Sequence, residues 1–525
     1  MSNHDIIDAR EKPKNKQKPC IMESGQDMYK RKSPQISFFD DPALFFTGAR
    51  FDSNNRWIKL ARMIPWNIVE EKYAKQFKST PFSRPAKPAR MAIGCLIIKD
   101  KFGLSDVQTI EMIAENPYMQ YFVGLTSFTN KAPIEASLLT WFRKRITADT
   151  LAQINDYIIG RKIIEHSKSK DDKDEPKDES RSYGETGGDS DAGSDTNNGT
   201  LILDATCVPS DIRFPTDVSL LNEGRECLEG IIDELHEQGN TNGVKPRTYR
   251  EVARKEFLRF VRNRKPSRKL IRRTIRKQLG YMHRDLTAID ACDITNLSEK
   301  NLQRLGVARK LYKQQHEMYE NKTHKTEDRI VSIQQPWVRP IVRGKATADV
   351  EFGAKVSISV LNGYSRIERL SWDAYNESKT LKDTVERYRE QTGVYPNRIL
   401  ADKIYRTREN LQYCSEHKIH MNGPKLGRPP MDKTIYAQQC ADERKESGER
   451  NIVEGTFGTG KRCYSLDRLS ARLQATCETQ IHLAFLTMNL WKRLKSLLRQ
   501  ITGAPEYVFL YFKRVRISNR PCFGM

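Results

Sequence analysis

Arg450-Asn-Ile-Val-Glu454-Gly-Thr-Phe-Gly-Thr-Gly-Lys461 is the stretch around which the rest of this 525-residue chain is organised. On a continuous helix, Arg450, Glu454 and Lys461 at positions i, i+4 and i+11 would share one face. An acid between two cations suits a site where a carboxylate holds a divalent ion and the cations hold phosphates. Solvated Arg/Glu/Lys triplets are also common, and the three glycines predict a poor helix beyond Phe457.

The composition points to an anionic partner. The chain has 90 Lys and Arg against 67 Asp and Glu, a formal net charge of +23, which favours nucleic acid. No apolar run reaches about 18 residues, so neither a transmembrane helix nor a membrane partner is expected. The first residues lack the layout of a signal peptide. Ten cysteines without a Cys-x-x-Cys pair argue against a zinc ribbon and for reduced thiols in a cytoplasm.

The first third of the chain is predicted to be a flexible tail followed by a helical domain. Residues 1–36 are polar and basic with little apolar periodicity. Residues 37–166 show helical patterns, with Ser105 as an N-cap and Pro133 as the first residue of a helix that ends in Arg143-Lys-Arg145. Short helices with a basic end suit a helix-turn-helix-like DNA reader, and a small bundle for dimer contact explains them equally well.

Residues 167–199 form a disordered acidic linker in this interpretation, because their composition offers no apolar face to bury. Leu201-Ile-Leu-Asp204-Ala-Thr206 follows and reads as a buried strand that contains an acid. An ionised carboxylate costs several kcal/mol to bury without a partner. Asp204 therefore needs a metal, a cation or a position at the end of the strand.

Residues 207–328 are predicted to be a helical segment with the densest positive charge in the chain. Between Lys245 and Lys277 there are 15 basic residues and two acidic ones, a net charge of +13 within 33 residues. An apolar stripe of Ile271, Ile275 and Leu279 marks an amphipathic helix. A membrane-surface helix or a solvated face is an alternative, but the narrow stripe without Trp favours phosphate binding.

From Arg329 the pattern becomes β. Arg329–Ile333 is expected to be a strand, and strands over 350–361 and 364–372 are joined by the Asn362-Gly363 turn. A helix over 377–391, a strand 398–402 that ends in Asp402 and a helix over 410–417 come next. The helix with Glu454 and a long helix over 471–498 complete the domain, and residues 501–525 form a tail.

Asp204, Asp402 and Glu454 can meet at one edge of such a sheet. Three gathered carboxylates repel one another unless divalent cations bridge them, and oxygen ligands favour Mg²⁺ or Mn²⁺ over zinc. Two such ions can activate a water or a 3′-hydroxyl and stabilise the leaving oxygen in an attack on phosphorus. A phosphate-binding P-loop is excluded because Arg462 stands where Ser or Thr is required.

These motifs together resemble the DDE transposases of bacterial insertion sequences, in the group with a Tyr-x₂-Arg-x₃-Glu-x₆-Lys signature. Arg450, Glu454 and Lys461 match that signature, with Ser447 in place of its Tyr. Ala401-Asp402-Lys-Ile404-Tyr-Arg406 is similar to the second-aspartate segment, with Ile404 in place of Gly. The segments that complete the resemblance are Leu203-Asp204-Ala-Thr206, Val338–Lys345, Glu351–Lys355 and the N-terminal stretch Ala89–Arg145.

The resemblance implies an α/β, RNase H-like catalytic core formed by residues 200–206 and 329–500, with a helical N-terminal DNA-binding domain and a basic helical insertion at 207–328. It implies that Asp204, Asp402 and Glu454 bind two Mg²⁺ or Mn²⁺ ions, cleave double-stranded DNA at terminal inverted repeats and join the ends to target DNA. A homodimer on bacterial nucleoid DNA is expected. An RNase H-like endonuclease without strand transfer and a catalytically dead DNA binder are the alternatives. The expected DNA contacts are Arg450, Lys461, Lys269, Arg272, Arg273, Arg276, Arg343 and Lys345.

Overall fold

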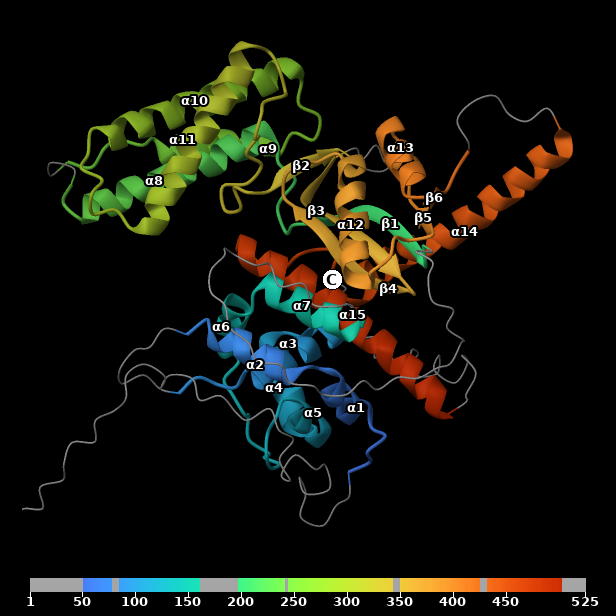
Figure 1. The fold of residues 1–525 in the computed structure, drawn as a ribbon. Coiled ribbons are helices and arrows are strands. Elements are labelled where there is room, and N and C mark those ends of the chain that lie inside the picture. Colours follow the sequence, from blue (N-terminus) through green and yellow to red (C-terminus); the bar gives the residue numbers. More distant parts are fainter. Residues whose placement is uncertain are drawn as a thin grey trace, which may run out of the picture.

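The computed structural model describes residues 51–77, 85–160, 197–240, 244–342, 350–424 and 432–502. It contains a group of short N-terminal helices, a mixed β-sheet with its own helices, and a helical bundle inserted after the first strand (Figure 1). The predictions made for residues 1–36, for most of 167–199 and 501–525, and for Arg343 and Lys345 lie outside the described residues. Among the described helices, none is both long enough and apolar enough to cross a membrane.

The N-terminal part is helical, as predicted. Its helices are α1 Arg56–Met63, α2 Trp66–Ala74, α3 Ala89–Phe102, α4 Asp106–Glu115, α5 Pro117–Phe122, α6 Leu138–Arg145 and α7 Ala148–Ile158. Ser105 caps α4 as expected, because its Oγ accepts the Gln108 N–H (3.2 Å) while Gln108 Oε1 accepts the Ser105 N–H (3.0 Å). The large side chains Trp57, Phe122 and Phe142 fill the core between these helices.

The start of α6 was predicted wrongly. Pro133 does not begin the helix, which starts five residues later at Leu138. The N–H groups of Leu138 and Leu139 donate to the carbonyls of Glu135 and Ala136 (both 3.1 Å), so tight turns precede the helical ladder. Pro133 therefore belongs to the connection, and only the basic end of the helix is confirmed.

The sheet has six strands in the order β2-β3-β1-β5-β6, with β4 also paired to β3. β1 is antiparallel to β3 and parallel to β5, and β5 is parallel to β6. The strands are β1 Thr200–Pro209, β2 Arg339–Val342, β3 Val350–Leu361, β4 Tyr364–Ser371, β5 Arg398–Leu400 and β6 His420–Met421. The predicted hairpin is confirmed: Asn362 and Gly363 both have positive φ (51° and 78°), which suits the turn that joins twisted antiparallel strands.

Arg329–Ile333 is not a strand, and this prediction was wrong. The Ile330 N–H donates to Gln314 Oε1 (3.0 Å), and Gln314 Nε2 donates to the carbonyls of Glu327 and Asp328 (3.0 and 3.1 Å). One helical side chain therefore binds the Ile330 N–H and the two carbonyls that precede the segment, and holds the segment against α11 (Glu299–Glu320). Ile330 and Ile333 pack against the bundle as an irregular segment, and the first strand after the insertion is β2.

The insertion is a bundle with its own core, formed by residues such as Leu228, Ile232 and Met282. Its helices are α8 Asp217–Glu237, α9 Arg250–Val261, α10 Arg268–Asp290 and α11 Glu299–Glu320. The apolar stripe of α10 faces this core as predicted, with Leu279 buried and Ile275 partly buried against it. Figure 1 shows the bundle standing beside the sheet, at the upper left, whereas the N-terminal helices lie below the sheet.

The remaining helices cover the sheet. They are α12 Leu381–Thr392 with the preceding 3₁₀ turn η3 Glu377–Thr380, η4 Lys403–Tyr405, α13 Arg408–Glu416, α14 Lys433–Cys463 and α15 Gln474–Thr502. α15 lies between the sheet and the N-terminal helices (Figure 1). Its Ile481 and Phe485 belong to the core under the sheet, whereas Leu486 and Leu490 belong to the core of the N-terminal helices.

The helix with Glu454 does not weaken at Phe457 as predicted but continues through all three glycines to Cys463. Val453 and Phe457 are buried under the sheet, and this packing outweighs low helix propensity. At Gly460 a Cβ would lie only 2.8 Å from Leu466 Cδ1, so any larger residue there would have to displace the buried Leu466 side chain. That glycine is therefore a packing requirement rather than a helix end.

Candidate active site

Two aspartates lie side by side on neighbouring strands: Asp204 is within β1, and Asp402 follows the end of β5. β1 and β5 are parallel and pair Ile202 with Leu400, and Asp204 and Asp402 each follow two residues later. Parallel strands run in one direction, so equal offsets place the two acids at the same edge. Asp402 is the N-cap of η4 and accepts the Lys403 N–H at Oδ1 (2.7 Å).

Glu454 comes from α14, which packs across both β1 and β5. The neighbouring Val453 is fully buried under the sheet, and the Glu454 side chain is 55% exposed. Arg450 lies one turn earlier and connects the acids: its Nη2 is 3.1 Å from Glu454 Oε1, and its Nη1 is 3.9 Å from Asp204 Oδ2. Residues far apart in the sequence thus meet through one guanidinium.

Asp204 lies in an environment that disfavours its charge. Burial raises the pKa of its carboxyl to about 6, although the Ala205 N–H (2.8 Å) and Arg450 act in the opposite direction. Glu377 and Asp402 raise this pKa further through like-charge repulsion. Crowded carboxylates of this kind favour a bound cation.

Glu377 is the acid that sequence reasoning missed. It begins η3 and pairs with Lys355 Nζ at 2.8 Å. η3 packs beside η4, because Asn410 Nδ2 donates to the carbonyls of both Ser378 and Tyr405 (2.9 and 2.8 Å). No periodicity marks an acid in a short connection, so only the fold reveals Glu377 next to the aspartates.

The donor chemistry at this edge fits a hard divalent cation, since Asp204, Asp402 and Glu454 offer only oxygen ligands. In the described part of the chain, however, no three His, Cys, Asp or Glu side chains are gathered closely enough to hold a metal ion. Glu454 is engaged with Arg450 and largely exposed, so its side chain has room to turn. The aspartate pair is the better-formed part of the site.

The predicted DNA contacts fall into two groups. Arg450 and Lys461 are on α14 with Glu454, and Lys461 lies two turns after that acid. The α10 cations are exposed on the bundle and form no ion pair with a described acid; Arg272 stacks on the Tyr319 ring at 4.2 Å. The α10 cations are Lys269, Arg272, Arg273 and Arg276.

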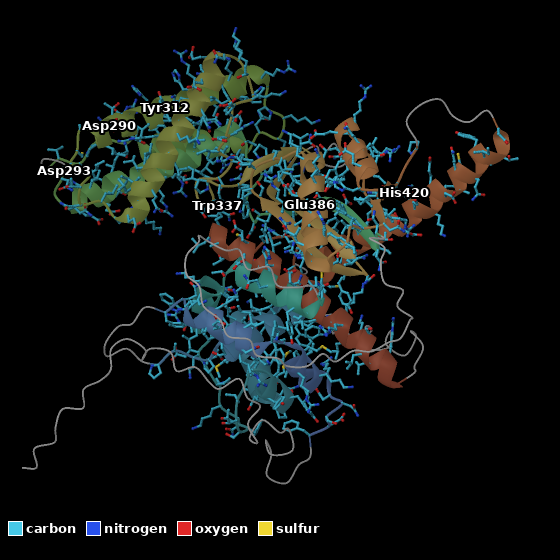
Figure 2. All side chains as sticks on the ribbon, viewed as in Figure 1. Asp290, Asp293, Tyr312, Trp337, Glu386 and His420 are labelled. Atoms are coloured by element: carbon cyan, nitrogen blue, oxygen red, sulfur yellow. The ribbon has the colours of Figure 1, made fainter. Side chains whose placement is uncertain are left out.

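The structure does not bring the α10 cations to the acids. Figure 2 labels Asp290, Asp293 and Tyr312 on the bundle, well apart from Glu386 and His420 around the sheet. Any nucleic acid that contacts both groups must therefore extend from the sheet edge to the bundle. Ile404, the departure from the second-aspartate pattern, lies in η4 and is half exposed.

Two transposase families match separate parts of this chain. Residues 399–491 match a family described as a transposase DDE domain, and residues 46–145 match one described as a transposase domain (DUF772). Asp402 and Glu454 fall within the first match, whereas Asp204 lies outside both.

A relative from Rhizobium meliloti, named uncharacterized protein ORF8 in nfe locus, is 37% identical over 97 residues. This alignment covers 18% of the present chain and 46% of the relative, so the chain spans less than half of that protein. No solved structure matches the chain. Together the matches support a transposase of the insertion-sequence type.

Proposed function

We propose that this protein is a DNA transposase that binds the terminal inverted repeats of an insertion sequence and performs metal-dependent strand cleavage and strand transfer. The observation that carries the proposal is the arrangement around Arg450, which contacts both Asp204 and Glu454 beside the strand end that carries Asp402. A mixed sheet with one acid within β1 and another just after the adjacent strand β5 also supports an RNase H-like core.

Asp204, Asp402 and Glu454 would hold the metal ions, which are two Mg²⁺ or Mn²⁺ in this proposal. Bound divalent ions supply an activated water or 3′-hydroxyl and stabilise the leaving oxygen on phosphorus. Arg450 and Lys461, on the helix that carries Glu454, hold the phosphates on either side of the scissile bond. Arg450 also neutralises the crowded carboxylates before DNA is bound.

The basic helix α10 would bind the phosphate backbone beyond the cleavage site. Its four predicted contacts are exposed and make no ion pair with a described acid, so they can neutralise DNA phosphates without breaking an internal interaction. The N-terminal helices, with the basic end of α6, are the proposed reader of the inverted repeat. A homodimer in the bacterial cytoplasm would bring two element ends together.

Cleavage of a labelled duplex that carries the element end tests this proposal. With Mg²⁺ or Mn²⁺ the native chain should cut at the terminus, and Asp402→Ala should lose activity by at least about a hundredfold. Asp383→Ala is the matched control, because Asp383 is an exposed acid in the first turn of α12. This control should cut like the native chain.

The other outcomes separate the alternatives. Metal-dependent cuts that ignore the terminal sequence and leave no joined product would indicate a general endonuclease. Equal, salt-sensitive DNA binding by the native chain and Asp402→Ala, with no cleavage by either, would indicate a DNA binder without catalysis. Either result would reject the transposase proposal.

A further inference from the structure

A groove runs between the N-terminal helices and the segment that joins α14 to α15. It encloses about 630 Å³ and has one wall from α3 and α6 and the other from residues 465–473 and the first turns of α15. The two walls come from parts of the sequence that are more than 300 residues apart. Because α15 is buried against both parts, the walls are held at a fixed separation.

The groove is lined by an excess of basic side chains. Asp106, the acid on its α4 side, is already neutralised, since Lys99 Nζ (2.6 Å) and Arg143 (two contacts of 2.8 Å) both bind its carboxylate. Lys144 and Arg472 are exposed and form no ion pair with any described residue. Lys144 instead lies 4.9 Å from the Trp141 ring. Asp467, on the same wall as Arg472, is an exposed acid of the lining, but the basic side chains outnumber the acidic ones and leave the groove with net positive charge.

The basic lining continues toward the insertion. Arg472 also lines a smaller cavity of about 170 Å³ at the base of the bundle, together with Arg213, Gln334 and Gln335. The cavity also contains Asp211, which pairs with Arg468, and Glu223, whose pKa is raised by burial and lowered by the charge of Arg213. Lys144 on α6 and Arg472 on the α14–α15 connection are therefore the cations of this line that no described acid neutralises. Such a line of charges matches a polyanion better than a compact ligand.

The groove lies at a defined distance from the acids. The Leu469 N–H donates to the Pro209 carbonyl (2.9 Å), which fixes the α14–α15 connection at the far end of β1. Asp204 lies five residues earlier on that strand, about 17 Å away at the usual rise per residue. This separation corresponds to about five base pairs of duplex.

We propose that this groove binds the sugar-phosphate backbone of duplex DNA, about five base pairs from the phosphate held at the acids. The inference rests on the proposed function and adds to it a binding site with Lys144 and Arg472 as its principal phosphate contacts. The contacts are to phosphate, so they position the duplex and carry no sequence information.

The test is the salt dependence of binding to a duplex that carries the element end, measured by fluorescence anisotropy with the full chain. The double variant Lys144→Gln/Arg472→Gln should lower the slope of log K against log salt by about 1.8, since each lost phosphate contact removes about 0.9. Lys144→Arg/Arg472→Lys should retain the native slope. Arg389→Gln/Lys418→Gln removes two exposed cations that lie outside the groove and outside the parts proposed to bind DNA, and it should also leave the slope unchanged.

Shortening the duplex locates the contact. The difference between the native chain and the double variant should disappear once fewer than about five base pairs remain on one side of the cleavage site. Should the double variant melt at a lower temperature, Arg472→Gln alone should still lower the slope by about 0.9. An unchanged slope in a folded variant refutes DNA binding by the groove but not the transposase function. A native chain that binds no DNA refutes both the groove proposal and the transposase function.

Discussion

The ion pair between Arg366 on β4 and Asp156 on α7 connects the N-terminal helices to the sheet. Its removal should lower the free energy of unfolding substantially. Arg366 Nε and Nη2 donate to the two Asp156 oxygens (2.7 and 3.1 Å), and the side chains are only 15% and 7% exposed. In Arg366→Met the aliphatic stem remains, but the Asp156 carboxylate stays buried with no cation among the described side chains.

Removing one partner of a buried ion pair costs about 3–5 kcal/mol, because the other charge stays desolvated. The lower end applies here, since Glu368, the second acid on Arg366, keeps Arg387 (Nη1–Oε2 2.5 Å). We therefore expect a loss of about 3 kcal/mol in the free energy of unfolding. Arg309→Met is the matched control: its pair with Asp290 is 45% and 59% exposed, and such pairs contribute about 1 kcal/mol at most.

Urea unfolding followed by tryptophan fluorescence measures both losses. Trp57 and Trp491 meet in the N-terminal core with ring centroids 5.7 Å apart, so opening of that core changes the signal. Adding Asp156→Asn to Arg366→Met should recover part of the lost free energy of unfolding, because it removes the buried, unpaired Asp156 carboxylate. If Arg366→Met costs no more than Arg309→Met, within about 0.5 kcal/mol, the pair does not fasten the two parts and the reasoning is wrong.

Three further predictions concern pH, packing and charge. Burial raises the pKa of Asp100 to about 7, so the native chain loses folding stability as the pH rises from about 4 to 7. Asp100→Asn should remove that loss. Over this pH range the stability of the variant relative to the native chain should grow by up to about 4 kcal/mol, measured by unfolding at successive pH values. Gly460→Ala should cost about 1–3 kcal/mol in thermal melts because its Cβ would press on Leu466, whereas Gly455→Ala, where no atom lies within 4 Å, should be neutral or stabilising. Neutralising the four α10 cations to Gln should lower the salt slope of DNA binding by about 3.6, with the thermal midpoint unchanged; a slope within error of the native value would remove α10 from the DNA path.

Local pattern was sufficient for the parts of the site that depend on one element. The apolar run around Asp204 predicts a buried strand, and the strand before Asp402 follows from the same rule, although it ends at Leu400 and Asp402 caps η4 instead. Arg450 and Glu454 contact each other as their spacing on a helix predicts. That the two aspartates lie side by side depends on the parallel pairing of β1 and β5, which no local pattern predicts.

Features that depend on contacts between residues distant in sequence could not be predicted from the sequence. Arg329–Ile333 has a strand-like composition, but the Gln314 side chain of α11 binds the Ile330 N–H, and no local pattern predicts that contact. The glycines of α14 indicate a helix end, and only the burial of Val453 and Phe457 under the sheet explains why the helix continues. Glu377 lies in a connection without periodicity, so its place beside the aspartates comes from the docking of η3 on η4.

The shared helix α15 decides which parts of the molecule can move independently. Its opposite faces are buried in the N-terminal core and under the sheet, and the Asn489 side chain connects Asn155 on α7 to Ser365 on β4 (2.7 and 2.6 Å). Separating these parts would expose apolar surface and several buried polar groups at once, so they behave as one body. The insertion instead keeps its core within its own helices. If DNA must bend to reach both the acids and α10, the bundle is therefore the part that can follow it, while the distance from α6 to the acids stays constant.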